Sequence, residues 1–222
     1  MTEHDRQTPA PARTWRRIRT GMARGSAPWL LPAFALVLAL GAVSAVVPVV
    51  LAAALPAVAL ALAMVWFFRD PDRVTAGAGI ACAADGVVQF IDPRSDGSTR
   101  VAVFMNPLNV HVNRAPLEGV VAGVQHRPGG FRPAFDKDSE RNERVIWTFQ
   151  TEIGEVTVVQ IAGAMVRRIV PYLTEGQKVE KGQRIGLIRF GSRVDVYLPP
   201  GVAPAVAVGQ KVRAGEARLD RE

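Results

Sequence analysis

The chain has a single cysteine, Cys82, and three histidines among its 222 residues. One cysteine excludes an internal disulfide and fits a reducing compartment. No histidines and cysteines stand together at metal-ligand spacing, so we expect no structural zinc site and no metal cofactor. Helical periodicity is nearly absent after Phe68, where short strand-like runs alternate with glycine-rich turns. The part of the chain after Phe68 is therefore predicted to be mainly β.

Residues 25–68 include no Asp, Glu, Lys, Arg or His. One membrane-spanning helix needs about 20 apolar residues, so this block predicts a hairpin of two apolar helices, with its reversal between Pro48 and Pro56. The block is too long for the core of a signal peptide and begins too deep in the chain. Trp29 and Trp66 lie near its ends, where aromatic rings favour a membrane interface. We expect membrane attachment, either across the bilayer or within one leaflet.

The net charge of +7 has a local source, because five arginines stand between residues 13 and 24. A basic cluster beside an apolar block is attracted to anionic lipid headgroups. No nucleic-acid-binding motif accompanies the charge, so we expect a lipid partner and no nucleic acid. The positive-inside rule places the N-terminal segment in the cytoplasm, and two spans return the C-terminal domain to the same side. The predicted organisation is a basic cytoplasmic segment 1–24, a hairpin 25–68 in the cell membrane, and one compact domain 69–222.

Seven runs in the third segment read as strands because β-branched and aromatic residues dominate them between turn residues. They are Gly86–Ile91, Arg100–Met105, Gly119–Val124, Arg144–Phe149, Glu155–Ile161, Arg184–Arg189 and Val194–Leu198.

An internal repeat narrows the fold. Residues 176–183, Gly-Gln-Lys-Val-Glu-Lys-Gly-Gln, are echoed by residues 209–216, Gly-Gln-Lys-Val-Arg-Ala-Gly-Glu. Such paired turns resemble those of lipoyl- and biotinyl-type domains, which are flattened barrels with two quasi-symmetric halves. A carrier domain of that kind needs a lysine between the copies, and none lies between Lys181 and Lys211. We therefore expect a flattened barrel or sandwich-like domain with a lipoyl-like quasi-repeat but without carrier chemistry.

The place midway between the copies holds Gly191-Ser192 instead of a lysine. Glycine leaves the carbonyl of residue 191 sterically open, and Ser192 supplies a hydroxyl one residue further on. The serine oxygen can attack that carbonyl in an N-to-O acyl shift. Most isolated Gly-Ser pairs are simply tight bends between strands, so the pair needs support from the rest of the chain.

Four motifs in order give that support: Phe67-Phe-Arg-Asp-Pro-Asp-Arg73, Ala84-Asp-Gly86, the run from Phe104 to Pro116 that contains Asn-Val-His-Val-Asn-Arg, and Phe190-Gly-Ser192. Together they resemble the phosphatidylserine decarboxylase family of the short bacterial type (type A), over roughly residues 66–222. The chain departs from the commonest pattern in two places. Phe-Gly-Ser-Arg replaces Leu-Gly-Ser-Thr, and Arg114 stands where longer members have a second histidine.

The resemblance implies a lyase that matures from a zymogen. Cleavage before Ser192 would give a β chain 1–191 and an α chain 192–222, which stay together as a heterodimer, with Ser192 converted to a covalent pyruvoyl cofactor. This ketone forms a Schiff base with the substrate amine and accepts electrons as carbon dioxide leaves. The implied substrate is the phospholipid phosphatidylserine, and the implied product is phosphatidylethanolamine.

Three further residues take roles from the resemblance, and each also has a plain structural explanation. His111 would donate a proton or contact the substrate, although an isolated histidine in a β domain is often structural. Asp85 aligns with the carboxylate that assists the processing serine, but it could merely cap a turn. Arg114 would grip the lipid phosphate or carboxylate, or else form a surface salt bridge.

Two other functions remain open from the sequence. A non-enzymatic membrane adaptor with a lipoyl-like domain would stay a single chain on a denaturing gel, and it usually has a heptad-patterned helical hairpin, which is missing here. A pyruvoyl-dependent decarboxylase of a soluble amino acid would have no reason to be held at a bilayer.

Overall fold

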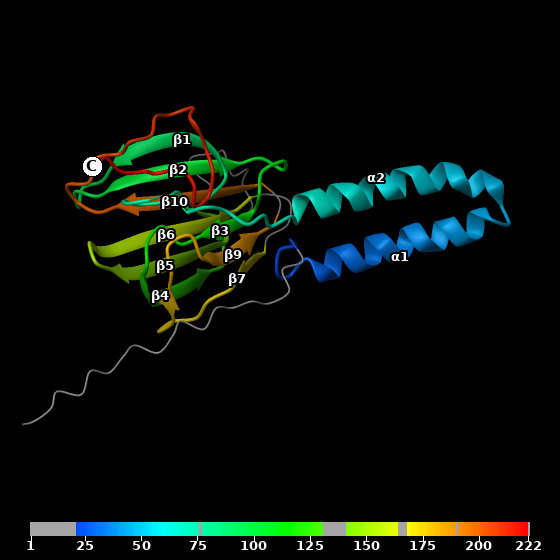
Figure 1. The fold of residues 1–222 in the computed structure, drawn as a ribbon, viewed down its shortest axis with the longest axis horizontal. Helices are drawn as coiled ribbons and strands as arrows, with labels where there is room; N and C mark the ends of the chain where they lie inside the picture. Colours follow the sequence, from blue (N-terminus) through cyan, green and yellow to red (C-terminus); the bar gives the residue numbers. More distant parts are fainter. Residues whose placement is uncertain (1–20, 76, 131–140, 164–167, 190, 222) are drawn as a thin grey trace, which may run out of the picture.

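The computed structural model describes residues 21–75, 77–130, 141–163, 168–189 and 191–221. Two helices project side by side from one side of a β domain (Figure 1). The prediction of a mainly β domain preceded by an apolar helical hairpin is confirmed.

The hairpin consists of α1 (Ala27–Ser44), the short 3-10 helix η1 (Pro48–Val50) and α2 (Leu51–Phe67). The chain reverses between Ser44 and Leu51, which overlaps the start of the predicted interval at Pro48, and Pro56 lies inside α2 rather than in the turn. Pro48 can begin η1 because the first turn of a helix needs no backbone N–H bond to a preceding residue.

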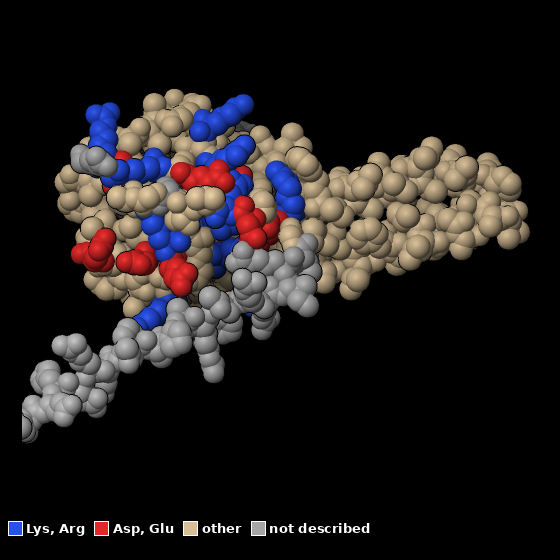
Figure 2. All heavy atoms as spheres, in the orientation of Figure 1, with Lys and Arg blue, Asp and Glu red and all other residues tan. Residues whose placement is uncertain are grey.

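The outer surface of the hairpin is apolar. No residue of α1 is buried, and the buried residues of α2 are three alanines and Phe67. In the view of Figure 2 the helices carry no Lys, Arg, Asp or Glu, and the side chains coloured as charged lie on the β domain. Both Ala27–Ser44 and Pro48–Phe67 are long and apolar enough to cross a membrane. Leucines and valines exposed on this scale are unfavourable in water, which indicates membrane association.

The β domain contains eleven short strands in the described residues. They are β1 (Gly86–Pro93), β2 (Thr99–Met105), β3 (Val112–Arg114), β4 (Gly119–Arg127), β5 (Arg144–Thr151), β6 (Gly154–Ala162), β7 (Ile169–Pro171), β8 (Lys178–Val179), β9 (Arg184–Ile188), β10 (Ser192–Leu198) and β11 (Lys211–Val212).

All strand pairs are antiparallel and form two sheets. The larger sheet has the order β11-β1-β2-β10-β6-β5-β4-β8, and the smaller has the order β3-β9-β7 (Figure 1). The edge strands β11 and β8 do not pair with each other in the part of the chain that the structure describes, so the sheets are open rather than a closed barrel. The sandwich-like form of the prediction is therefore the one observed.

The repeat forms the two edges of the larger sheet. Lys178 and Val179 pair with the start of β4, and Lys211 and Val212 pair with the start of β1. The glycine that opens each copy makes an equivalent bond, since Gly176 N donates to Val121 O and Gly209 N to Val88 O, both at 2.8 Å. The two copies therefore form equivalent edge strands at opposite ends of the larger sheet, in agreement with a domain of two quasi-symmetric halves.

The main core lies against the larger sheet and includes Trp147, Phe149, Val194 and Val196, all fully buried. A second apolar cluster joins the hairpin to the β domain. In it the buried Phe67 and Phe68 pack with Val112 of β3 and Leu187 of β9. The base of α2 is thus fixed on the smaller sheet.

Candidate active site

Gly191 and Ser192 lie where β9 ends and β10 begins. Gly191 has φ +65°, a conformation that glycine adopts far more readily than other residues, and a Cβ built there would meet none of the described residues within 4 Å. Ser192 is hydrogen-bonded into the sheet between Met105 of β2 and Ala162 of β6. The structure thus places a bend with open space directly before a serine whose backbone is held on both sides.

The Ser192 side chain is fully buried, and its Oγ has no hydrogen-bond partner among the described residues. A buried polar atom without a partner costs about 1–3 kcal/mol, so native structures contain few of them. The unpaired hydroxyl is the strongest sign that this serine has a task other than stabilising the fold.

His111 lies between β2 and β3 and is fully buried. Its Nδ1 is 3.0 Å from the carbonyl oxygen of Asn109. A carbonyl oxygen only accepts, so in the neutral ring Nδ1 carries the proton and Nε2 has a free lone pair. Nε2 is also buried and lacks a partner among the described residues. His111 therefore presents a proton acceptor inside the protein.

The surroundings keep the ring of His111 neutral. Burial is the main cause that lowers its pKa to about 4, and the nearby Arg69 guanidinium lowers it further, while the bond to Asn109 opposes them. The Phe67 ring lies 4.3 Å from the imidazole, centroid to centroid. The fold also ties His111 to the serine segment, because Ile188 N, three residues before Gly191, donates to His111 O at 3.2 Å.

Asp85 directly precedes β1. Its Oδ2 accepts from Arg73 Nη2 at 2.8 Å, and its Oδ1 accepts from Ala214 N at 2.9 Å. Because β2 lies between β1 and β10, two strand spacings, roughly 10 Å, separate the backbone here from Ser192. No hydrogen bond between Asp85 and Ser192 or His111 is present in the described part of the chain.

Arg114, at the end of β3, is 5% exposed. Its guanidinium donates to Gly182 O at 3.0 Å and to Pro71 O at 2.8 Å, and lies 3.5 Å from the Asp70 carboxylate. The side chain therefore links the segment after α2, at Pro71, to the turn before β9, at Gly182. It does not line the cavity described next.

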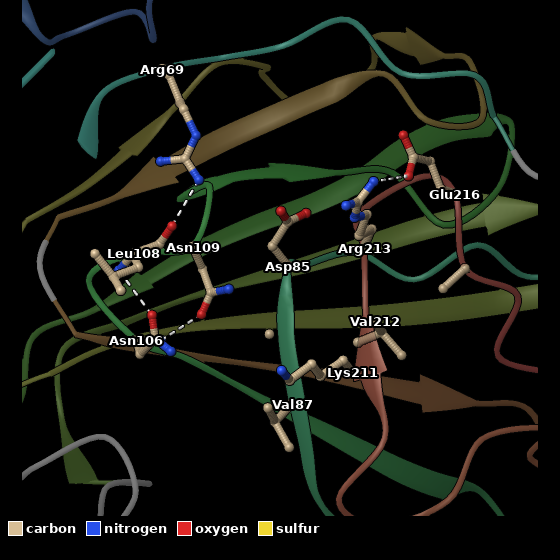
Figure 3. A pocket seen from close by; sticks show the side chains of 12 residues that line it. Arg69, Asp85, Val87, Asn106, Leu108, Asn109, Lys211, Val212, Arg213 and Glu216 are labelled. Atoms are coloured by element: carbon tan, nitrogen blue, oxygen red, sulfur yellow. Dashed lines mark hydrogen bonds and ion pairs between the residues drawn. The ribbon is translucent and has the colours of Figure 1, made fainter. Parts of the chain in front are cut away.

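A cavity of about 590 Å³ opens beside Asp85 (Figure 3). Its lining includes three cationic side chains that the sequence did not single out: Arg69, Lys211 and Arg213. Lys211 and Arg213 belong to the second copy of the repeat. Arg213 stands where the first copy has Glu180. This change from a negative to a positive charge between the two copies is the sequence signal that could have identified Arg213 as a site residue. The cavity combines these cations with the carboxylates of Asp85 and Glu216.

A chain of buried amides supports the serine strand. Trp147 Nε1 donates to Gln160 Oε1 at 2.7 Å, and Gln160 Nε2 donates to Asn113 Oδ1, also at 2.7 Å. Asn113 Nδ2 in turn lies 3.6 Å from the sulfur of Met105, the strand neighbour of Ser192. These bonds join β5, β6, β3 and β2, and so hold the two sheets in register around the serine.

Within the described residues no group of three or more His, Cys, Asp or Glu side chains could hold a metal ion. The family model for phosphatidylserine decarboxylase matches residues 60–220, which cover the β domain and the end of α2. The chain belongs to the phosphatidylserine decarboxylase family. The resemblance seen in the four motifs is thereby confirmed.

Three individual family members align with 74% or more of the chain. A phosphatidylserine decarboxylase proenzyme of Thermobifida fusca is 72% identical over 207 residues, 93% of this chain and 95% of the relative. One from Streptomyces avermitilis is 58% identical over 223 residues, 97% of this chain and 98% of the relative. A putative archaetidylserine decarboxylase proenzyme of Halobacterium salinarum is 54% identical over 167 residues, 74% of this chain and 83% of the relative.

Membership of the phosphatidylserine decarboxylase family favours the enzyme over the membrane-adaptor alternative. The relatives are named as proenzymes, a term for chains that need processing.

Proposed function

We propose that this protein decarboxylates phosphatidylserine to phosphatidylethanolamine with a pyruvoyl group made from its own Ser192. The observation that carries the proposal is the buried Ser192 Oγ, which has no hydrogen-bond partner among the described residues and follows the left-handed Gly191. The family and the proenzyme names of its members support the same reaction.

Maturation begins at the Gly191–Ser192 bond. Ser192 Oγ attacks the Gly191 carbonyl carbon, the C–N bond breaks, and an ester to Oγ replaces the amide. Loss of the Ser192 Cα proton then breaks the Cβ–Oγ bond. This leaves a carboxylate on Gly191 and a dehydroalanine at position 192. Water hydrolyses the tautomer of that residue, releases ammonia and leaves the ketone.

The site suits a pyruvoyl group because Ser192 is buried, while the space beside Gly191 is open. When formed, the group supplies an electrophilic carbonyl that binds the substrate amine and withdraws electrons as carbon dioxide leaves. The β10 strand keeps residue 192 in place after the cut, because β10 lies wholly on the new chain and its pairing with β2 and β6 does not depend on the broken bond.

His111 handles protons at Nε2. As the neutral ring that its lowered pKa favours, it takes up the proton that the substrate ammonium group loses, and it then gives that proton to the carbon from which carbon dioxide departs. Asp85 assists the acyl shift. Its contacts with Arg73 and the Ala214 N–H orient the carboxylate at the cavity. Arg114 acts from further away by holding the Asp70–Pro71 segment next to Arg69.

The cavity beside Asp85, which Ser192 and His111 do not line in the uncut chain, receives the lipid headgroup. Phosphatidylserine carries a phosphate and a carboxylate, which complement the cations Arg69, Lys211 and Arg213, and an ammonium group, which complements the carboxylates Asp85 and Glu216. The names of the relatives pair two lipid types with one serine headgroup, which supports recognition of the headgroup rather than of the chains.

The hairpin holds the enzyme on the cell membrane, with the domain 69–222 on the cytoplasmic side and the cleaved chains 1–191 and 192–222 together as a heterodimer. Two spans return the domain to the side of the basic segment 1–24, which lies outside the described residues in positions 1–20.

The proposal is tested with Ser192→Ala. The wild-type protein should give two bands on a denaturing gel and release carbon dioxide from phosphatidylserine, whereas the variant should give one band and no release. Ser98→Ala is the matched control, because Ser98 is another buried serine whose hydroxyl already bonds Asp96. Activity in an uncut wild-type chain, or release from free amino acids but not from the lipid, would refute the proposal.

A further inference from the structure

The turn Asn106–Asn109 between β2 and β3 presents an exposed leucine and is held by side-chain-to-backbone hydrogen bonds. Leu108 is 70% exposed. Its own N–H donates to Asn106 Oδ1 at 2.9 Å, and Asn106 N donates to Asn109 Oδ1 at 2.8 Å. Asparagine side chains that bond nearby backbone groups fix a turn locally. The fold therefore presents the apolar side chain to its surroundings on a fixed support.

Arg69 ties this turn to the base of α2. Its Nη2 donates to Leu108 O at 2.7 Å, and its Nη1 donates to Trp66 O at 2.6 Å. The same guanidinium lies 4.1 Å from the centroid of the Trp66 ring, which is 54% exposed. The exposed Leu108 and Trp66 are joined by the half-buried Arg69 beside the apolar hairpin, and we call these three residues the Leu108 patch.

Other cation–aromatic pairs lie at the same end of the hairpin. The Arg189 guanidinium lies 6.0 Å from the centroid of Trp29, near the start of α1, and Arg24 lies 5.1 Å from that of Tyr172. Side chains with an apolar body and a polar tip favour the level of lipid headgroups. Trp29 lies near the start of α1 and Trp66 near the end of α2, so these pairs mark the level at which the two helices join the β domain. Arg69 fixes Leu108 at that level.

The turn also forms a wall of the cavity. Asn106, Leu108 and Asn109 line one side, facing Asp85 and Lys211 across the opening (Figure 3). The turn Asn106–Asn109 thus connects the cavity with the base of the hairpin.

We propose that the turn Asn106–Asn109 is a bilayer-contacting lip, in which Leu108 enters the headgroup–acyl boundary of a phospholipid membrane beside α2 and holds the cavity opening against the bilayer. Continuity with the apolar hairpin identifies the occupant of the Leu108 patch as lipid. A serine headgroup then reaches the cavity while its acyl chains stay in the membrane. Only this last consequence rests on the proposed function.

The first experiment measures insertion. Cys82 is the single cysteine and is fully buried, so Leu108→Cys creates one accessible thiol for a nitrobenzoxadiazole label. The full chain is reconstituted in phosphatidylcholine–phosphatidylglycerol vesicles with or without lipids that carry a doxyl quencher. The label at position 108 should shift to the blue and be quenched by the doxyl lipids.

Ile153→Cys is the matched control. Ile153 is another exposed apolar side chain, in the turn between β5 and β6, and Ala162 at the far end of β6 is the neighbour of Ser192. A label at 153 should remain unquenched. Equal quenching at the two positions, or none at 108, would overturn the proposal.

A second experiment compares substrates for Leu108→Asp. Burial of a leucine contributes a factor of roughly ten or more to an association constant. Carbon dioxide release per cleaved chain should therefore fall at least about tenfold more on phosphatidylserine in vesicles than on monomeric short-chain phosphatidylserine. Ile153→Asp should leave this ratio at the wild-type value. Equal losses on both substrates would show that Leu108 acts inside the cavity and would overturn the lip. A wild-type protein without decarboxylase activity would refute the proposed function, whereas the quenching result is independent of activity.

Discussion

Arg193 and Asp195 form a fully buried ion pair on the strand that begins with Ser192. Arg193 Nε lies 2.8 Å from Asp195 Oδ1, and Nη2 lies 3.1 Å from Oδ2. Successive residues of a strand face opposite sides, so the pair lies on the face of the sheet away from the Ser192 side chain. Asp195 Oδ2 also lies 3.7 Å from Arg100 Nη1 on β2, so in the mature enzyme this carboxylate would link the new chain 192–222 to the other chain.

Breaking this pair should destabilise the protein strongly. Asp195→Ala leaves the Arg193 guanidinium in the interior without its bidentate carboxylate, and loss of one partner of a buried pair typically costs about 3–5 kcal/mol. For a chain of this size each kcal/mol lowers the melting temperature by about 2–4 °C. Thermal unfolding in detergent should therefore show a fall of roughly 6 °C or more.

A surface pair is the control for that measurement. Arg213 is well exposed and lies 3.6 Å from Glu216, and exposed pairs contribute about 0–1 kcal/mol. Arg213→Ala removes only the exposed partner and should change the melting temperature by only a few degrees. Equal shifts in the two variants would contradict the importance of the buried pair.

The pH dependence of stability should report the buried, neutral His111. Its pKa in the folded protein is about 4, below the unfolded value of 6.5, so the unfolded state binds more protons between these values. The contribution of His111 to stability is complete above pH 6.5 and is lost as the pH falls towards 4, on the order of 3 kcal/mol in total. His111→Gln should therefore lose less stability than wild type over this window. If the melting temperatures of wild type and His111→Gln fell in parallel from pH 7 to pH 4, the result would contradict the assignment.

Two single variants should separate self-cleavage from decarboxylation. Asp85→Ala removes the carboxylate assigned to the acyl shift and should accumulate uncut precursor. His111→Ala should be cut at least in part, but its carbon dioxide release per cleaved chain should fall about 10²–10⁴-fold, the usual contribution of a general acid or base. The cleaved fraction is read from a gel. Full activity per cleaved chain in His111→Ala would remove the imidazole from the mechanism.

The larger strands and the helical hairpin could be predicted from the sequence because their signals are local. The seven predicted strands correspond to β1, β2, β4, β5, β6, β9 and β10, and the repeat indicated two quasi-symmetric halves. The strands β3, β7, β8 and β11 have only two or three residues, too few for a visible alternation. Pro56 was expected in the turn, but it is accommodated inside the apolar helix α2.

The site was predictable in part. Ser192, Gly191 and His111 were found through motifs, and the structure brings the His111 segment to the end of β9, just before Gly191. The cations of the cavity come from distant parts of the chain: Lys211 and Arg213 from the second repeat copy, and Arg69 from the segment after α2. Tertiary structure, including the pairing of β11 with β1, brings them to one cavity. The orientation of Arg114 towards Pro71 and Gly182 depends on tertiary packing, and no sequence pattern reveals it.

Removal of residues 1–66 should affect lipid access more than maturation. The cleavage chemistry lies within 69–222, and Phe67 and Phe68 would remain to cover Val112 and Leu187. The truncated protein should still self-cleave. Its activity should drop sharply on lipid bilayers and less on short-chain phosphatidylserine in detergent. Equal loss on the two substrates would indicate that the hairpin serves folding instead.

The most direct test of the account is the intact mass of the purified wild-type protein. We predict two chains, 1–191 and 192–222, the smaller one lighter by one ammonia than the peptide with an N-terminal serine. Reduction with cyanoborohydride in the presence of phosphatidylserine should add the lipid to the smaller chain alone. A single active chain of full mass, or a smaller chain that begins with an unmodified serine, would contradict the central claim that Ser192 becomes the catalytic pyruvoyl group.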